Sequence, residues 1–169
     1  MSMKKYVFKK IVTDFVIINI IINGIFYIFN FRKFSGQLTF NDIATDLFVG
    51  LLLLGGACSL IGFVNMRKEL LKGKIDVSEF KTSQLYNKLP KATVLRVLLL
   101  TLMTAIITMT FFILVPKIVG IDKINHFIGF SFKIFTAGLM AAVIGYIVVD
   151  LSISDYQHSH ITMKDTTVV

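Results

Sequence analysis

Polar side chains that could handle a solute occur inside two long apolar segments of the chain. The first of these segments carries Asn19 and Asn23, with Asn30 near its far end, and helical spacing places all three within about 40° of one face. Amide groups are costly in hydrocarbon, so this face is expected to look onto protein or water. We take Asn19 and Asn23 as candidates for lining a solute path, and packing against a neighbouring helix is an equally good interpretation.

Three threonines share one face of a later apolar segment. Thr101, Thr104 and Thr108 fall within about 60° of arc on a helix, which makes them further candidates for a solute path. A threonine hydroxyl in a helix can also donate to the carbonyl one turn back, and it then needs no ligand. This structural interpretation is the stronger one for the threonines.

Other chemistry is poorly supported by the sequence. The single cysteine, Cys58, excludes an intramolecular disulfide, and His126, His158 and His160 lack a further partner that would make a metal site. No His-Glu-x-x-His, Gly-x-Ser-x-Gly or phosphate-binding glycine loop occurs. We therefore expect no catalytic site, no metal site and no cofactor.

The polar residues stand in apolar segments that are each long enough to cross a bilayer. The chain is 55% hydrophobic and 17% charged, with a mean hydropathy of +0.77. A helix needs about 20 residues to cross about 30 Å of hydrocarbon. The sequence predicts an all-α integral membrane protein of one domain, with transmembrane helices over residues 11–31, 45–66, 94–115 and 127–151. A loop over 67–93 and a loose tail over 152–169 complete this prediction.

The basic residues predict how the helices are oriented. Thirteen of the 18 lysines and arginines lie at the amino terminus, in the loop 67–93 or elsewhere on the same side, and five lie on the opposite side. Basic residues accumulate on the cytoplasmic side of membrane proteins. We expect a protein of the cell membrane with both termini in the cytoplasm. The protein has a net charge of +8, and we expect its basic residues to interact with anionic lipid. A nucleic-acid partner is not expected, because no nucleic-acid-binding pattern accompanies the lysines.

The sequence pattern contains one helical hairpin twice. A lysine, a glycine and an asparagine recur at an offset of 84 residues, as Lys33, Gly36 and Asn41 and again as Lys117, Gly120 and Asn125. Each copy begins and ends on the cytoplasmic side, so the copies are parallel and related by a pseudo-twofold axis along the membrane normal. The prediction is therefore two tandem parallel hairpins.

Small residues form a matching stripe on the second helix of each hairpin. Such stripes let helix backbones approach closely in lipid. We expect the second and fourth helices to meet at the centre through these stripes, with the first and third helices flanking them. The stripes are Gly55, Ser59 and Gly62 in one copy and Gly138, Ala142 and Gly145 in the other.

Four ionisable residues lie near the ends of the apolar segments. Asp14 and Arg96 are close enough to the cytoplasmic side to reach the interface. Asp46 lies about 180° from the stripe of its helix, and Lys133 lies about 140° from its own stripe. If the stripes face each other, both charges point away from the seam, so no ion pair between Asp46 and Lys133 is expected.

Two classes of function fit these features. A small permease or channel-like protein for a small solute or ion is slightly favoured by the asparagine and threonine faces and by the repeat, and it would be a homo-oligomer because four helices enclose little water. A non-transporting accessory, regulatory or immunity-type protein that binds a larger membrane partner is the alternative, because no charge is expected at the membrane midplane. An enzyme is not expected.

Overall fold

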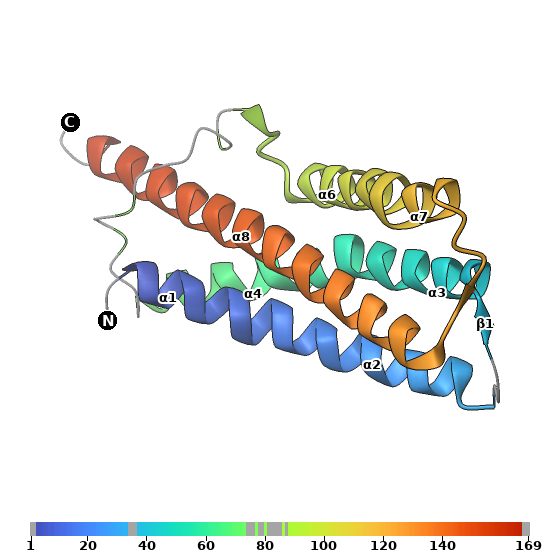
Figure 1. Ribbon diagram of the computed structural model, residues 1–169. Helices are drawn as coiled ribbons and strands as arrows, with labels where there is room; N and C mark the ends of the chain where they lie inside the picture. The colour runs from blue at the N-terminus through green and yellow to red at the C-terminus, as the bar shows by residue number, and fades with distance from the viewer. Residues whose placement is uncertain are drawn as a thin grey trace.

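Long helices make up most of the structure (Figure 1). The computed structural model describes residues 3–33, 37–73, 77, 80, 86 and 88–166. Within these residues, four helices are long and apolar enough to cross a membrane, as the sequence predicts. In chain order the four spans are Met3–Phe31, Phe40–Leu71, Thr93–Ile118 and His126–Ser159.

Three of the spans combine α-helical and π-helical stretches. The first consists of α1 (Met3–Lys10), η1 (Ile11–Ile17) and α2 (Ile18–Phe31). The second consists of α3 (Phe40–Leu53), η2 (Leu54–Cys58) and α4 (Ser59–Leu71). The third consists of α6 (Thr93–Ile107), η3 (Thr108–Leu114) and α7 (Val115–Ile118), and the fourth belongs to α8 (His126–Thr166). The π-helical stretches η1 and η2 lie at major helix contacts, η1 against α8 and η2 against α6.

The second span begins earlier than the sequence analysis predicts. It starts at Phe40 and not at Thr45, because Thr39 caps the helix. The Thr39 hydroxyl oxygen accepts a hydrogen bond from the Asp42 backbone N–H at 3.3 Å. The cap residue lies outside the apolar run, so hydropathy alone places the boundary too late.

The tail that was predicted to be loose is helical up to Thr166. Ser152 and Ser154 are buried, and the Gln157 amide donates to the backbone carbonyls of Val77 and Phe80 at 2.6 and 2.8 Å. The prediction failed because Ser152 and Gln157 find hydrogen-bond partners within the protein, Ser152 by donating to the Val148 carbonyl at 2.7 Å. Residues 74–76, 78–79, 81–85 and 87 of the predicted loop 67–93 and the last three residues of the tail lie outside the described residues.

Short connections join the spans at one end of the bundle. There β1 (Leu38–Thr39) pairs antiparallel with β2 (Lys123–Ile124), with Thr39 opposite Lys123. Both chain termini and the described residues between α4 and α6 lie toward the opposite end (Figure 1). We call the end with the strands the strand end and the opposite one the terminal end.

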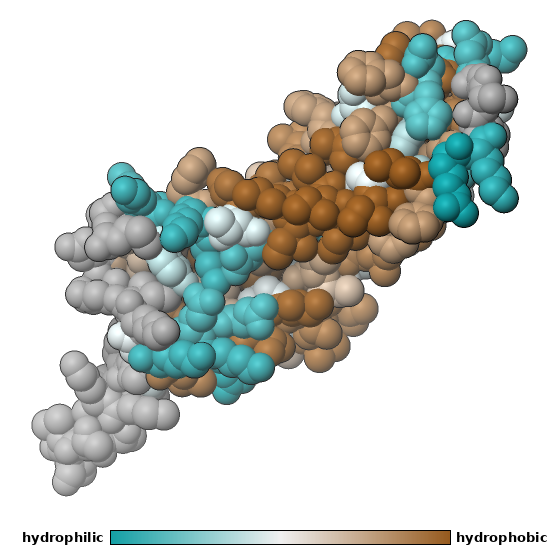
Figure 2. All heavy atoms as spheres, turned by 90° about the horizontal axis from the view of Figure 1, so that it is seen from below, coloured by the Kyte–Doolittle hydropathy of each residue, from teal (hydrophilic) through white to brown (hydrophobic). Residues whose placement is uncertain are grey.

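The fourth span lies at the centre of the packing. It contacts the first span through η1 and α2 and the second span through α3 and α4, while the third span packs against the second. Leu47, Leu51 and Leu54 of the second span and Met140 and Ile144 of the fourth are buried in this core. Large apolar side chains also cover the outside of the bundle, and Figure 2 shows them as a brown belt between two teal ends. Such a belt fits a multi-pass membrane protein.

Gly55 and Gly138 of the two small-residue stripes do not face each other, which corrects the expected packing. A Cβ added at Gly55 would lie 2.8 Å from the Thr101 Cα of the third span. A Cβ added at Gly138 would lie 3.3 Å from Ile20 of the first span. Each of these glycines therefore admits a flanking helix, although the second and fourth spans also contact each other. Of the remaining stripe positions, Ser59 is buried and Ala142 is half-buried.

Phe15 of the first span occupies a notch formed by the other two stripe glycines. A Cβ at Gly145 would lie 2.8 Å from the Phe15 ring, and a Cβ at Gly62 would lie 2.6 Å from it and 3.1 Å from Val148. The aromatic ring thus fills the space between the second and fourth spans in the terminal half of the bundle. The absence of a side chain at these glycines is what makes room for it.

Candidate functional site

The structure contains the ion pair that the sequence analysis did not expect. The Lys133 ammonium group on α8 binds the Asp46 carboxylate on α3. The Lys133 side chain is 1% exposed and the Asp46 side chain 10%. The assumed seam was wrong at Gly55 and Gly138, which contact the third and first spans. Because Gly55 and Gly138 face the flanking spans, other faces of α3 and α8 meet in this half of the bundle and bring the two charges together.

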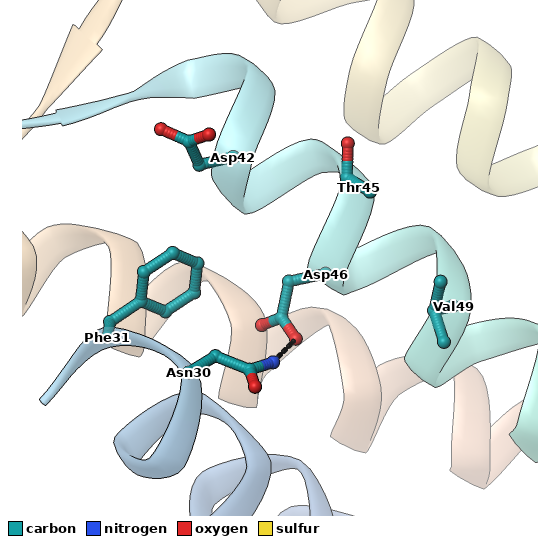
Figure 3. A pocket seen from close by; sticks show the side chains of 6 residues that line it. All are labelled: Asn30, Phe31, Asp42, Thr45, Asp46 and Val49. Carbon is teal, nitrogen blue, oxygen red and sulfur yellow. Dashed lines mark hydrogen bonds between the residues drawn. The ribbon is translucent and has the colours of Figure 1, made fainter.

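A cavity of about 390 Å³ opens beside this ion pair at the strand end. Figure 3 shows Asn30 and Asp46 pointing toward each other from α2 and α3, and the Asn30 amide donates to Asp46 Oδ1 at 2.7 Å. Asp42, one turn before Asp46, and Thr45 line the same cavity. The Asp46 carboxylate therefore borders the cavity, with Oδ1 bound to Asn30 and Oδ2 bound to Lys133.

Asn23 and Asn19 continue the polar face of the first span into the bundle. Both side chains are buried, and their amide nitrogens donate to the carbonyls of Asn19 and Phe15 at 2.9 and 2.8 Å. Asn23 Oδ1 has no hydrogen-bond partner among the described residues. It occupies the space of a Cβ at Gly50, which lies beside the Lys133 side chain. The buried Asn23 Oδ1 is thus an unused hydrogen-bond acceptor on the same side of Gly50 as the Lys133 side chain.

The threonine face of the third span is separate from the asparagine face. Thr101, Thr104 and Thr108 donate to the carbonyls one turn back, at 2.8, 2.7 and 2.7 Å. Among the described residues, no hydrogen bond joins these threonines to Asn19 or Asn23. The structure therefore does not bring the two groups of candidate residues into one lining, and the hydroxyls are satisfied within their own helix.

The terminal half of the bundle is closed below Asn19. Phe15 is buried and packs against Gly62 and Gly145, and its cluster includes Phe63, Met66 and Leu70. Polar groups on this face of the first span thus extend from the exposed Asn30 to the buried Asn23 and Asn19, and the face then meets the buried Phe15 ring.

A second buried cation lies near the terminal end. Arg96 is 1% exposed and is enclosed by protein groups. Its guanidinium binds the Asp155 carboxylate through two bonds of 2.5 and 3.1 Å and donates to the Pro90 carbonyl at 2.6 Å. The guanidinium also lies over the Tyr86 ring, 5.7 Å from the ring centroid. These partners compensate for the loss of water around the charge and allow Arg96 to be buried.

The Tyr86 side chain links this pair to the end of α8. Its ring stacks on His158 with 4.6 Å between the centroids. Burial raises the pKa of the Tyr86 hydroxyl, and the Asp155 carboxylate nearby raises it further. The hydroxyl therefore stays neutral near neutral pH and serves as a packing group.

Two further ionisable residues escaped the sequence analysis. Glu69 near the end of α4 accepts hydrogen bonds from Tyr6 and Lys10 at 2.8 and 2.5 Å, and Lys10 also binds Asp14. Asp150 is 3% exposed in the middle of α8. Asp150 interrupts an apolar run from Val143 to Leu151, which is the signal that could have identified it.

Two further observations concern possible metal sites and similarity to known proteins. Among the described residues, no three His, Cys, Asp or Glu side chains lie together so that they could hold a metal ion. Comparison of the chain with protein-family models, curated proteins and solved structures finds no match. The candidate site is therefore defined by its geometry alone, as the Lys133–Asp46 pair, Asn30 and Asn23.

Proposed function

We propose that the protein is a small, oligomeric permease or channel-like protein of the cell membrane for a small solute or ion. The observation that carries the proposal is the Lys133–Asp46 ion pair, which is buried in the bundle and borders an open cavity. Ionisable residues inside membrane spans are rare, face the bundle interior and mark substrate or ion pathways. A purely structural pair could have been replaced by apolar side chains at little cost in stability.

In this proposal a solute enters at the strand end. It first meets Asp46, Asp42 and Asn30 in the cavity, where carboxylate and amide groups replace part of its hydration shell. Exchange of one Asp46 contact from Lys133 to the solute frees the ammonium group, whose neighbour Asn23 offers an unused acceptor. The Asn23 and Asn19 side chains form the next steps, and movement of Phe15 out of the glycine notch opens the route to the terminal end.

Both termini lie in the cytoplasm in this proposal. It is supported by the thirteen-to-five distribution of basic residues and by the position of both termini at one end of the bundle. Single cysteines at Ser78 and Gln37 in a Cys58→Ser background test it in intact cells with a membrane-impermeant reagent. Labelling of Gln37 alone is expected, and labelling of Ser78 alone would overturn the orientation.

The two-hairpin repeat is also part of the proposal. It is supported by the pairing of Thr39 with Lys123, which are separated by the repeat offset of 84 residues. The glycine contacts support it as well, because Gly55 meets Thr104 where Gly138 meets Ile20, and these two neighbours are again 84 residues apart. A twofold axis that exchanges the copies maps the contact between spans one and four onto that between spans three and two.

The accessory protein is the second candidate, and one observation favours it. The amide nitrogens of Asn19 and Asn23 and the hydroxyls of the three threonines already donate within their own helices. These donors are therefore not free for a solute. In the apolar stretch of the third span, 17% of the residues are buried, so most of this span is exposed. In the accessory protein, this exposed surface would contact a larger membrane partner.

Two parallel assays separate the candidates. Purified protein in liposomes is tested for release of protons, of Na⁺ and K⁺, and of small neutral solutes, with empty liposomes as the control. A tagged copy in mild detergent is tested for a stoichiometric membrane partner. Flux above the control together with self-association supports the permease, and a defined partner without flux refutes it.

A further inference from the structure

A separate pocket at the terminal end combines positive charge with apolar walls. It has a volume of about 390 Å³ and lies between α4, the start of α6 and α8. Phe63, Leu70, Leu71 and Tyr156 supply apolar walls, and Arg67 and Lys91 supply two cations. No role in the proposed solute route uses this pocket, because it lies at the end opposite Asp46 and Lys133.

The charge of this pocket is not balanced within the described part of the chain. Asp155 also lines it, but its two oxygens bind the Arg96 guanidinium. No salt bridge to Arg67 or Lys91 occurs among the described residues, where both side chains are exposed. The pocket therefore carries a net positive charge that is open to a ligand.

The backbone of α6 adds donors to the same place. Thr93, the first residue of this 15-residue helix, lines the pocket, and Ala92 before it has no side chain that could cap the helix. The first N–H groups of a helix lack partners within the helix and carry the positive end of the helix dipole. Together with two cations, they match the oxygens of a phosphate group.

The height of the pocket identifies the source of the phosphate. Exposed Val64 lies three residues before Arg67, and Val94, which is 69% exposed, lies three residues after Lys91. At about 1.5 Å per residue of helix, Arg67 lies about 4–5 Å beyond Val64 on α4, and Lys91 precedes the helix that carries Val94. Both cations therefore lie at the terminal edge of the apolar belt. This is the level of lipid headgroups, and the apolar walls suit the glycerol and upper acyl region of a lipid. We infer that this pocket binds the headgroup of an anionic phospholipid.

Binding of short-chain lipids to the full chain in detergent micelles tests the inference. Dioctanoyl-phosphatidylglycerol should bind, whereas dioctanoyl-phosphatidylcholine and inorganic phosphate should neither bind comparably nor displace it. The double variant Arg67→Gln, Lys91→Gln loses two charge-assisted hydrogen bonds, so its affinity should fall roughly a hundredfold. The matched variant Lys68→Gln, Lys72→Gln removes the same charge from the same helix end outside the pocket, and its affinity should fall less than about tenfold.

A third variant separates binding from folding. Ala92→Asp provides a cap for α6, so the melting temperature without lipid should stay the same or rise. The new carboxylate also takes up the free N–H groups and repels the phosphate, so phosphatidylglycerol binding should weaken by about tenfold or more. Equal losses in the pocket variant and the matched variant would overturn the inference in favour of diffuse surface charge. Inorganic phosphate that binds as tightly as the lipid, or phosphatidylcholine that does so, would also overturn it.

Discussion

The two ends of the bundle each bury a cation against a carboxylate, and they differ in how completely the cation is surrounded. Arg96 at the terminal end has two bonds to Asp155, one to the Pro90 carbonyl and the face of Tyr86. Lys133 at the strand end binds the Asp46 carboxylate, to which Asn30 also donates a hydrogen bond. The Asn23 Oδ1 atom nearby accepts no hydrogen bond among the described residues. Full coordination fits a structural role, and incomplete coordination beside a cavity leaves room for exchange with a ligand.

The largest expected effect on stability concerns the fully coordinated cation. Arg96→Ala leaves Asp155 and the Pro90 carbonyl without their donor and removes packing beside Tyr86. The free energy of unfolding in detergent should fall by about 2–3 kcal/mol, below the value for a fully buried pair because Asp155 is 39% exposed. Lys68→Ala, an exposed residue outside both pairs, serves as the control and should change it by less than about 0.5 kcal/mol. An Arg96→Ala variant as stable as this control would remove the structural role.

The glycine notch in the terminal half gives the next largest effect. Gly145→Ala places a Cβ 2.8 Å from the Phe15 ring, so the ring must shift, and the cost should be about 1–3 kcal/mol. Gly56→Ala is the matched control, because its nearest neighbour, Thr101 Oγ1, is 3.5 Å away. The control should be neutral or slightly stabilising, since alanine favours helix over glycine. Thermal unfolding that gives both substitutions the same sign would contradict the plug at Phe15.

The polar faces of the first and third spans should respond differently to loss of their polar groups. Asn19→Leu with Asn23→Leu should abolish flux and cost roughly 0.6 kcal/mol of stability per lost bond, because each amide bonds within its own helix. Thr104→Val with Thr108→Val should leave flux unchanged, because among the described residues these hydroxyls bond to carbonyls of their own helix and not to the asparagine face. Flux and melting temperature of both double variants provide the test. Normal flux per folded molecule in the asparagine variant would contradict a solute path along Asn19 and Asn23.

The sequence predicted the four spans well because their hydropathy is high and continuous. Because helical periodicity is a local property, it also predicts a direction for Asp46 and for Lys133 relative to the stripe of each helix. It could not tell which neighbour each face meets, since apolar residues on all sides look alike whether they contact lipid or protein. The Lys133–Asp46 pair was therefore missed, although both residues had been singled out.

The remaining differences arise from contacts that are distant in sequence. Arg96 is buried because Asp155, 59 residues later, reaches it, and the end of α8 is helical because Gln157 bonds to residues around 80 positions earlier. From composition alone, Arg96 is expected to extend toward the membrane interface, and the end of α8 is expected to be a loose tail. Hydropathy and periodicity describe each helix by itself, whereas these features depend on tertiary partners.

The double substitution Asp46→Leu, Lys133→Met tests the central claim most directly. Replacing a buried ion pair by apolar side chains of similar size is often neutral or stabilising, so the melting temperature should be unchanged or higher. The measurement is flux per folded molecule in liposomes for protons, Na⁺, K⁺ and small neutral solutes, beside the parent protein and empty liposomes. We expect flux in the parent and its loss in the variant. Equal flux in both, or no flux in the parent above empty liposomes, would contradict the assignment of this ion pair to a solute path.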